Sequence, residues 1–228
     1  MPLLSVITGT RREAFCFRSL IRTGQIEITC SGANSNRATV LAEQAVAAGA
    51  TSLLSFGLAG GLDPSLGSGT LVVAESIIDP PADRFSTDEA WRLAVAEDLT
   101  KAGIDFVSGA GIGADEAIPN PEAKKKLFED TQALFVDMES HAVMQVAREH
   151  GVPCLVIRAI ADSALDILPN VAMTIIDSDG EVRYGALAQK LLSQPSDIFK
   201  LISLWRVSRH AFANLSRVAS LPSLRGSF

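Results

Sequence analysis

The chain has 228 residues, of which 47% are hydrophobic and 20% charged, and it contains 17 Gly and 10 Pro, values typical of one folded globular domain. The formal net charge of -6 argues against general binding to nucleic acid. No apolar run approaches the roughly 20 residues that span a bilayer, and the start of the chain lacks a signal-peptide pattern. Three cysteines without CxxC spacing (Cys16, Cys30 and Cys154) indicate buried, reduced thiols. We therefore expect a cytoplasmic protein.

Short apolar or β-branched runs bounded by glycine alternate with helical stretches, which is the pattern of an α/β domain with a largely parallel sheet. The clearest predicted helix is Asn34–Ala48, because Asn34 or Ser35 can cap it and Gly49 can end it. The other predicted helices are Thr87–Lys101, Pro121–Glu129 and Glu139–Glu149. The predicted strands are Leu3–Thr8, Ile26–Cys30, Ser52–Gly57, Leu71–Ile78, Phe106–Gly109, Leu134–Val136 and Cys154–Ala159.

The third predicted strand leads into a glycine-rich stretch that contains Gly57, Gly60 and Gly61. Glycines at the carboxyl end of a parallel strand allow a ligand to approach the backbone closely, although a tight turn would use them equally well. The spacing is not GxGxxG and no helix follows directly, so a dinucleotide-binding motif is not indicated.

Acidic residues follow two later strands of the predicted sheet. Asp137 and Glu139 lie at a strand–helix junction, and Asp162 follows a buried strand. Acids at such ends point into the cleft where open α/β sheets bind ligands. The alternatives are a favourable charge at a helix N-terminus for Glu139 and a helix cap for Asp162.

Two other kinds of site are not indicated. The three histidines (His141, His150 and His210) show no metal-ligand spacing, so we expect no metal. No GxSxG elbow for a nucleophilic serine occurs either.

A set of motifs in order along the chain carries a family resemblance: TGTRREA, CSGANSNRA, SFGLAGGLDPSLGSGTLVVA, VDMESHAV and VIRAIADSA. Together they resemble the nucleoside phosphorylase and nucleosidase superfamily, which includes purine nucleoside phosphorylases and methylthioadenosine/adenosylhomocysteine nucleosidases. The chain looks most like the hopanoid-associated phosphorylases, which are assigned to removing adenine from adenosylhopane. The resemblance implies one domain over residues 1–228, a three-layer α/β/α phosphorylase-like fold with a mixed, mostly parallel central sheet, and a homodimer or larger assembly.

The resemblance also implies roles for individual residues. Asp162 would donate a proton or hydrogen bond to N7 of the leaving purine. Glu139 would accept hydrogen bonds from the ribose hydroxyls and steady a cationic sugar, against which Met138 would pack. Glu13 would orient an attacking water, although it could instead be an exposed acid on a helix.

The implied base pocket and anion site match the family less well. The segment GADEAI nominates Asp115 and Ile118 for base binding, but Ala117 stands where an aromatic residue is usual. Ser55 and Leu58 stand at the positions of the arginine and serine that hold phosphate in family phosphorylases. Arg11, Arg12 and Arg37 are the candidate substitutes. We therefore expect hydrolysis, with inorganic phosphate as the alternative co-substrate and no other cofactor.

The end of the chain has a different charge balance, because six basic residues and one acid give +5 from Gly185 to Phe228. A basic amphipathic helix is predicted at about 195–218, with Trp205 and Phe212 near its apolar stripe. It could dock on the domain or lie on an anionic membrane surface. The leading hypothesis is cleavage of adenosylhopane. The alternatives are a nucleosidase acting on soluble methylthioadenosine or adenosylhomocysteine, and a nucleoside-binding protein without catalysis.

Overall fold

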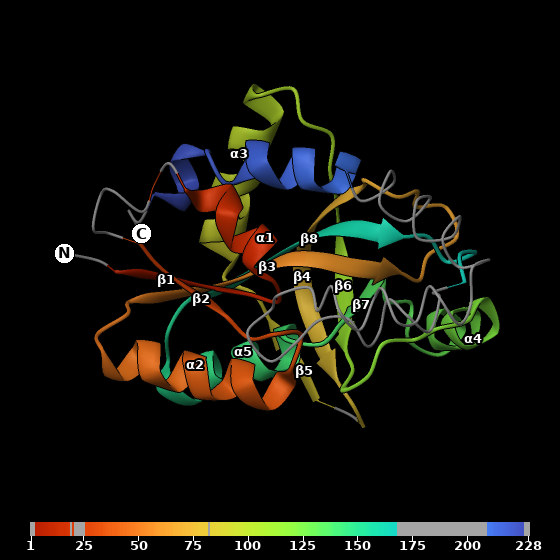
Figure 1. Cartoon of the computed structure of the whole chain (residues 1–228), viewed down its shortest axis with the longest axis horizontal. Coiled ribbons are helices and arrows are strands. Elements are labelled where there is room, and N and C mark those ends of the chain that lie inside the picture. The colour runs from red at the N-terminus through yellow and green to blue at the C-terminus, as the bar shows by residue number, and fades with distance from the viewer. Residues whose placement is uncertain (1–2, 19, 21–25, 82, 168–208, 226–228) are drawn as a thin grey trace, which may run out of the picture.

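A computed structural model describes residues 3–18, 20, 26–81, 83–167 and 209–225 of the chain (Figure 1). All seven predicted strands are present, and those predicted at Ser52–Gly57, Phe106–Gly109 and Cys154–Ala159 extend three or four residues beyond their predicted ends. The strands are β1 (Leu4–Thr8), β2 (Ile26–Cys30), β3 (Ser52–Gly61), β4 (Leu71–Asp79), β5 (Asp83–Ser86), β6 (Val107–Gly113), β7 (Phe135–Asp137) and β8 (Cys154–Asp162). Only β5 was not predicted. It is a polar edge strand in which Phe85 alone is buried, so it lacks an apolar run.

The sheet is mixed and mostly parallel, as predicted. Its strand order is β2-β1-β3-β7-β6-β4-β5, and β8 pairs in parallel with β3 and antiparallel with β4. The far end of β3 also pairs with β7, through Gly60 and Gly61. The strands β3, β8, β4, β6 and β7 therefore close on themselves, and the ends of several strands meet around one opening.

The four predicted helices are present, and a side-chain cap fixes the start of three of them. They are α2 (Ser35–Ala47), α3 (Glu89–Lys101), α4 (Pro121–Thr131) and α5 (Ser140–His150). Asn34, Asp88 and Asn120 cap the first three with their side chains, so the predicted starts at Asn34 and Thr87 fall outside the helices. Glu139 occupies the N-cap position of α5 without a side-chain capping bond. Three short helices were not predicted: α1 (Arg11–Ala14), η1 (Phe15–Phe17) and η3 (Pro222–Leu224).

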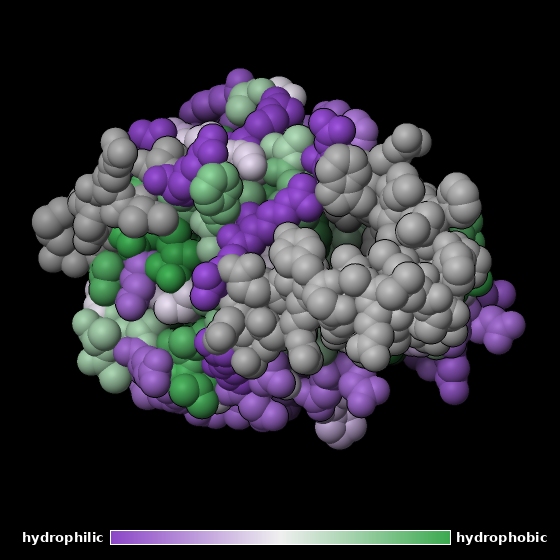
Figure 2. All heavy atoms as spheres, in the orientation of Figure 1, coloured by the Kyte–Doolittle hydropathy of each residue, from purple (hydrophilic) through white to green (hydrophobic). Residues whose placement is uncertain are grey.

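The helices form layers on both faces of the sheet, which confirms the predicted three-layer arrangement (Figure 1). On one face, α2 and α5 bury an alanine-rich stripe against the sheet (Ala38, Ala42, Ala45, Ala142 and Ala147). On the other face, α3, which contributes Trp91, and the helix over residues 209–218 cover Phe17 and the apolar side chains of β3 and β8. Hydrophilic residues predominate along the lower edge of Figure 2, where α2 and α5 lie. Both helices thus show one buried and one solvated face.

The described part of the C-terminal helix docks on the domain. Ala211, Leu215 and Val218 are buried, and the guanidinium of Arg12 lies 4.0 Å from the ring centroid of Phe212. The remainder of the predicted helix, with Trp205, lies outside the described residues, so contact with a membrane stays a prediction. Within the described ranges, no helix is long and apolar enough to cross a membrane.

The free thiols differ in burial, which corrects one expectation. Cys154 is buried, and burial raises its pKa to about 12. Cys16, in η1, and Cys30, the last residue of β2, are only partly buried.

Candidate active site

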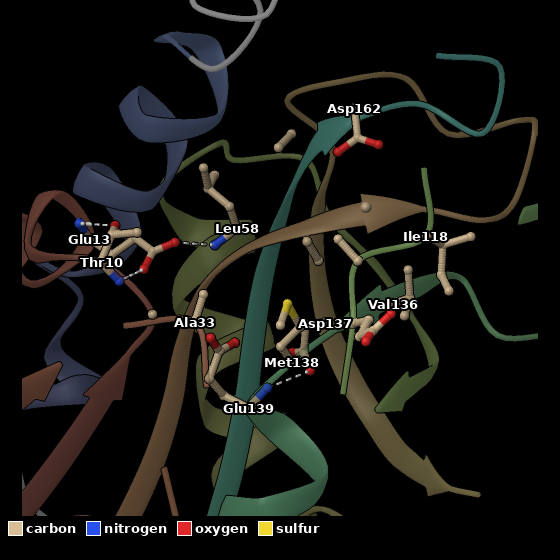
Figure 3. A pocket seen from close by; sticks show the side chains of 16 residues that line it. Thr10, Glu13, Ala33, Leu58, Ile118, Val136, Asp137, Met138, Glu139 and Asp162 are labelled. Atoms are coloured by element: carbon tan, nitrogen blue, oxygen red, sulfur yellow. Dashed lines mark hydrogen bonds between the residues drawn. The ribbon is translucent and has the colours of Figure 1, made fainter. Parts of the chain in front are cut away.

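A cavity of about 230 Å³ lies where β1, β3, β7 and β8 end. Figure 3 shows the 16 residues that line it. Six of the candidate site residues are among them: Glu13, Gly60, Ile118, Met138, Glu139 and Asp162. Glu13 and Asp162, which are 149 positions apart in the sequence, therefore line one cavity, because the strands bring their ends together.

Glu13 enters this cavity from the first turn after β1. Its carboxylate is held by two backbone groups, since Oε1 accepts the N–H of Leu58 at 2.8 Å and Oε2 accepts the N–H of Thr10 at 2.6 Å. The second contact closes a capping box with Thr10 on α1. Glu13 is only 4% exposed, so the alternative of an exposed helix acid is wrong. Burial raises its pKa, and the two backbone hydrogen bonds oppose that change.

Gly57 on β3 makes room for a carboxylate. A Cβ on Gly57 would lie 2.7 Å from Oε1 of Glu13, whereas a Cβ on Gly60 would make only ordinary contacts, at 3.4 Å from Cγ1 of Val136 and 3.6 Å from Oδ2 of Asp162. Gly61 instead permits close packing on the end of β8, beside the side chain of Ile160. The strand thus needs glycine at position 57 because the carboxylate of Glu13, and not a ligand, lies against its backbone.

Glu139 and Met138 follow β7 and line the same cavity. Glu139 is buried, which is the largest cause of a pKa raised from 4.5 to about 8. The negative charge of Asp137 raises the pKa further, whereas the cation of Arg158 opposes it. A Cβ on Gly9 would lie 2.8 Å from Oε1 of Glu139 and 3.3 Å from Oε2 of Glu13. The two carboxyl groups therefore face the same small space above Gly9.

Arg158 was not predicted, although it organises the wall beneath Glu139. It is 1% exposed and pairs through Nε with Asp137. Its Nη2 donates to the hydroxyls of Ser55 at 2.6 Å and Ser140 at 3.0 Å. The same Nη2 lies 3.7 Å from Oε2 of Glu139. A charged side chain inside the apolar strand VIRAI was the available signal, because buried charges require partners.

Asp162 ends β8, where it is buried and lines the cavity. Its Oδ2 pairs with the ammonium of Lys124, a residue of α4 that was not predicted. Burial raises the pKa of Asp162, and the charge and hydrogen bond of Lys124 oppose that change. The capping alternative for Asp162 finds no support, because no described helix starts there.

Other candidates lie outside the cavity lining. Asp115 accepts a hydrogen bond from the hydroxyl of Ser35 at 2.7 Å and is exposed, while its neighbours Glu116, Ala117 and Ile118 line the cavity. The candidate phosphate residues are Arg11 and Arg12 on α1 and Arg37 on α2, and none of the three lines it. Their proposed role stays a prediction.

Comparison with known proteins assigns the fold. A family model described as the phosphorylase superfamily matches residues 6–193. The chain belongs to the phosphorylase superfamily. This confirms the resemblance at the level of the superfamily, whereas the hopanoid-associated branch stays a prediction.

Three relatives illustrate the similarity of this superfamily member. It is 27% identical over 135 residues to aminodeoxyfutalosine nucleosidase from Helicobacter pylori, an alignment that covers 52% of the chain and 58% of that relative's length. A methylthioadenosine/adenosylhomocysteine nucleosidase from Neisseria meningitidis superposes with a TM-score of 0.72, 18% identity and 96% coverage of both chains. The futalosine hydrolase of Helicobacter pylori superposes with a TM-score of 0.70 and 19% identity, covering 95% of this chain and 97% of that one. At these identities the two structures show a shared fold.

Proposed function

We propose that the protein hydrolyses the N-glycosidic bond of an adenine nucleoside. Its superfamily and the names of its relatives, all nucleosidases or hydrolases of nucleosides, support the reaction class. The observation that carries the proposal is the meeting of three buried carboxyl groups, those of Glu13, Glu139 and Asp162, in one cavity.

The chemistry requires a different task at each end of the breaking bond. The electron pair of the C–N bond leaves with the purine, so Asp162 transfers its proton to N7 of the base. The sugar becomes cationic, and this positive charge favours the ionised form of Glu139, whose carboxylate then stabilises the sugar most strongly in the transition state. Water then attacks the anomeric carbon while Glu13 accepts the proton that water loses. A carboxyl whose pKa is raised by burial is a better base at neutral pH than an exposed one.

The cavity favours water over phosphate as the nucleophile. No arginine or lysine is among the 16 residues that line it in the described part of the chain. The backbone N–H of Leu58, on the glycine-rich strand, already binds Glu13, and Ser55 already binds Arg158. A phosphate dianion needs several charge-assisted hydrogen bonds, and here it would meet carboxyl groups instead.

We propose adenosylhopane as the substrate, with soluble methylthioadenosine, adenosylhomocysteine or aminodeoxyfutalosine as the competing substrates. The motifs VDMESHAV and TGTRREA support the first choice. A homodimer and contact with the membrane are further parts of this proposal.

Release of adenine by the purified protein tests the reaction. Each candidate nucleoside is supplied with and without inorganic phosphate, and both base and sugar products are identified. We expect free adenine and a reducing sugar at equal rates in both buffers. Glu13→Gln should lower turnover by about 100-fold or more, the usual scale for a lost general base. Glu27→Gln, on the exposed face of β2, is the matched control and should retain turnover.

Two results would contradict the proposal. A sugar 1-phosphate product that forms only with phosphate would establish phosphorolysis. Binding of nucleosides without any base release would favour the non-catalytic alternative.

A further inference from the structure

Lys124 occupies an unusual position for a lysine. It stands in a run of three lysines on α4, yet its side chain is fully buried, whereas Lys125 is exposed and pairs with Glu129 at 3.7 Å. It shares one helix face with Leu127 and Phe128, which pack in the adjoining apolar cluster. A buried ammonium is costly unless each of its hydrogens finds an acceptor.

Three oxygens surround the ammonium. Nζ contacts Oδ2 of Asp162, the carbonyl oxygen of Ser163 at 2.8 Å and the carbonyl oxygen of Asp166 at 3.3 Å. The turn after β8 is itself fixed, because Oδ2 of Asp166 accepts the backbone N–H of Ser163 at 2.7 Å and its hydroxyl at 2.8 Å. An ammonium has three donors, so this cradle matches the protonated form of Lys124.

The arrangement also directs Asp162. Lys124 contacts Oδ2, and the carboxyl group lines the cavity from the end of β8 (Figure 3). Two charged groups act directly on Asp162: Lys124 on α4 and Asp166 in the following turn. Four further acids line the same cavity: Glu13, Glu116, Asp137 and Glu139.

We infer that Lys124 is a positioning residue that orients Asp162 and sets its acid strength, an inference that rests on the proposed function. When the proton on Oδ1 of Asp162 moves to N7, the O–H bond breaks, the N–H bond forms, and a carboxylate remains on Asp162. The ammonium of Lys124 stabilises that carboxylate and takes no part in the proton transfer. Burial alone would make Asp162 a weak acid, because it favours the neutral carboxyl, and the adjacent cation restores acid strength.

The test replaces the cation and follows the protonation of Asp162 directly. Protein labelled with ¹³C at the aspartate carboxyl carbons is titrated by NMR, and the Asp162 resonance is assigned by its loss in Asp162→Asn. In Lys124→Met the midpoint should move to higher pH by at least about one pH unit, as expected when an adjacent opposite charge is removed. Lys124→Arg keeps a cation and should stay near the wild type. Lys125→Met is the matched surface control.

Kinetics supply the second readout. Lys124→Met should lower kcat for adenine release by about tenfold or more, and the alkaline limb of the pH–rate profile should move to higher pH. Lys124→Arg should recover most of both. Lys124→Gln replaces Lys124→Met if circular dichroism shows that the latter does not fold.

A folded neutral variant with an unchanged Asp162 midpoint would overturn the inference, as would an equal change in Lys125→Met. The NMR titration needs no turnover, so it also separates this inference from the proposed function. If the wild-type protein released no adenine but the Asp162 titration midpoint still moved in Lys124→Met, only the proposed reaction would be refuted.

Discussion

Replacing Gly57 by alanine tests how closely the carboxylate of Glu13 lies against β3. The new Cβ would be 2.7 Å from Oε1 of Glu13 and 2.8 Å from its Cδ. Ordinary contact begins at 3.4 Å, so the carboxylate must retreat by about 0.7 Å. That movement takes Oε1 away from the strand and lengthens its 2.8 Å hydrogen bond from the N–H of Leu58 beyond hydrogen-bonding distance.

The size of the effect follows from the bond that is lost. A hydrogen bond to a charged group contributes about 1.5–3 kcal/mol, so the free energy of unfolding should fall by about that amount. A catalytic group misplaced by about 1 Å can cost roughly 100-fold in rate, so turnover should fall by about 10- to 100-fold. Chemical denaturation and adenine release measure the two quantities.

Gly67→Ala is the matched control, because a Cβ there meets no atom within 4 Å. It should leave both turnover and stability near the wild type. If Gly57→Ala behaved like Gly67→Ala in both assays, Glu13 would not be held against β3, and its assignment as the water-activating base would lose its structural support.

Two further predictions concern Glu139. Glu139→Gln should reduce kcat by more than it changes KM, because the carboxylate is needed most when the sugar is cationic; an effect on KM alone would make Glu139 a binding contact only. The pKa of Glu139 is raised from 4.5 to about 8 in the folded protein. The folded state therefore holds more protons than the unfolded state between about pH 4.5 and 8. The contribution of this group to stability is lost as the pH rises through that window. Denaturation of wild type and Glu139→Gln across this window should therefore show the variant losing less stability with rising pH, and parallel curves would contradict the raised pKa.

The fold could be predicted because its signals are local. Apolar runs bounded by glycine mark most strands, and Asn34 marks the start of a helix. The predicted end of β3 at Gly57 was too early, since pairing with β8 and β7 extends the strand to Gly61 despite its glycines. Long-range pairing of this kind leaves no trace in a short window of sequence.

The site was predictable where function depends on position at a strand end. Glu139 and Asp162 follow strands, so topology alone placed them near a cleft, whereas their roles came from the family resemblance. The two buried cations were missed for opposite reasons. Lys124 lies in a lysine run that is typical of a solvated face, and Arg158 lies in an apolar strand whose single charge should have predicted a buried partner.

The distribution of those cations suits the proposed reaction. Lys124 contacts Asp162, where the purine would gain electron density as it leaves. Arg158 forms an ion pair with Asp137 and donates hydrogen bonds to two serine hydroxyls and a backbone carbonyl oxygen. Its nearest approach to the carboxyl group of Glu139 is 3.7 Å. Glu13 is held by backbone N–H groups. The space above Gly9, between Glu13 and Glu139, is therefore rich in carboxyl groups, while the other end of the cavity has a cation behind its acid. A bond that breaks into a cationic sugar and an electron-rich base would have each fragment beside the group that stabilises it, and a phosphate anion entering beside the sugar would meet the carboxyl-rich end.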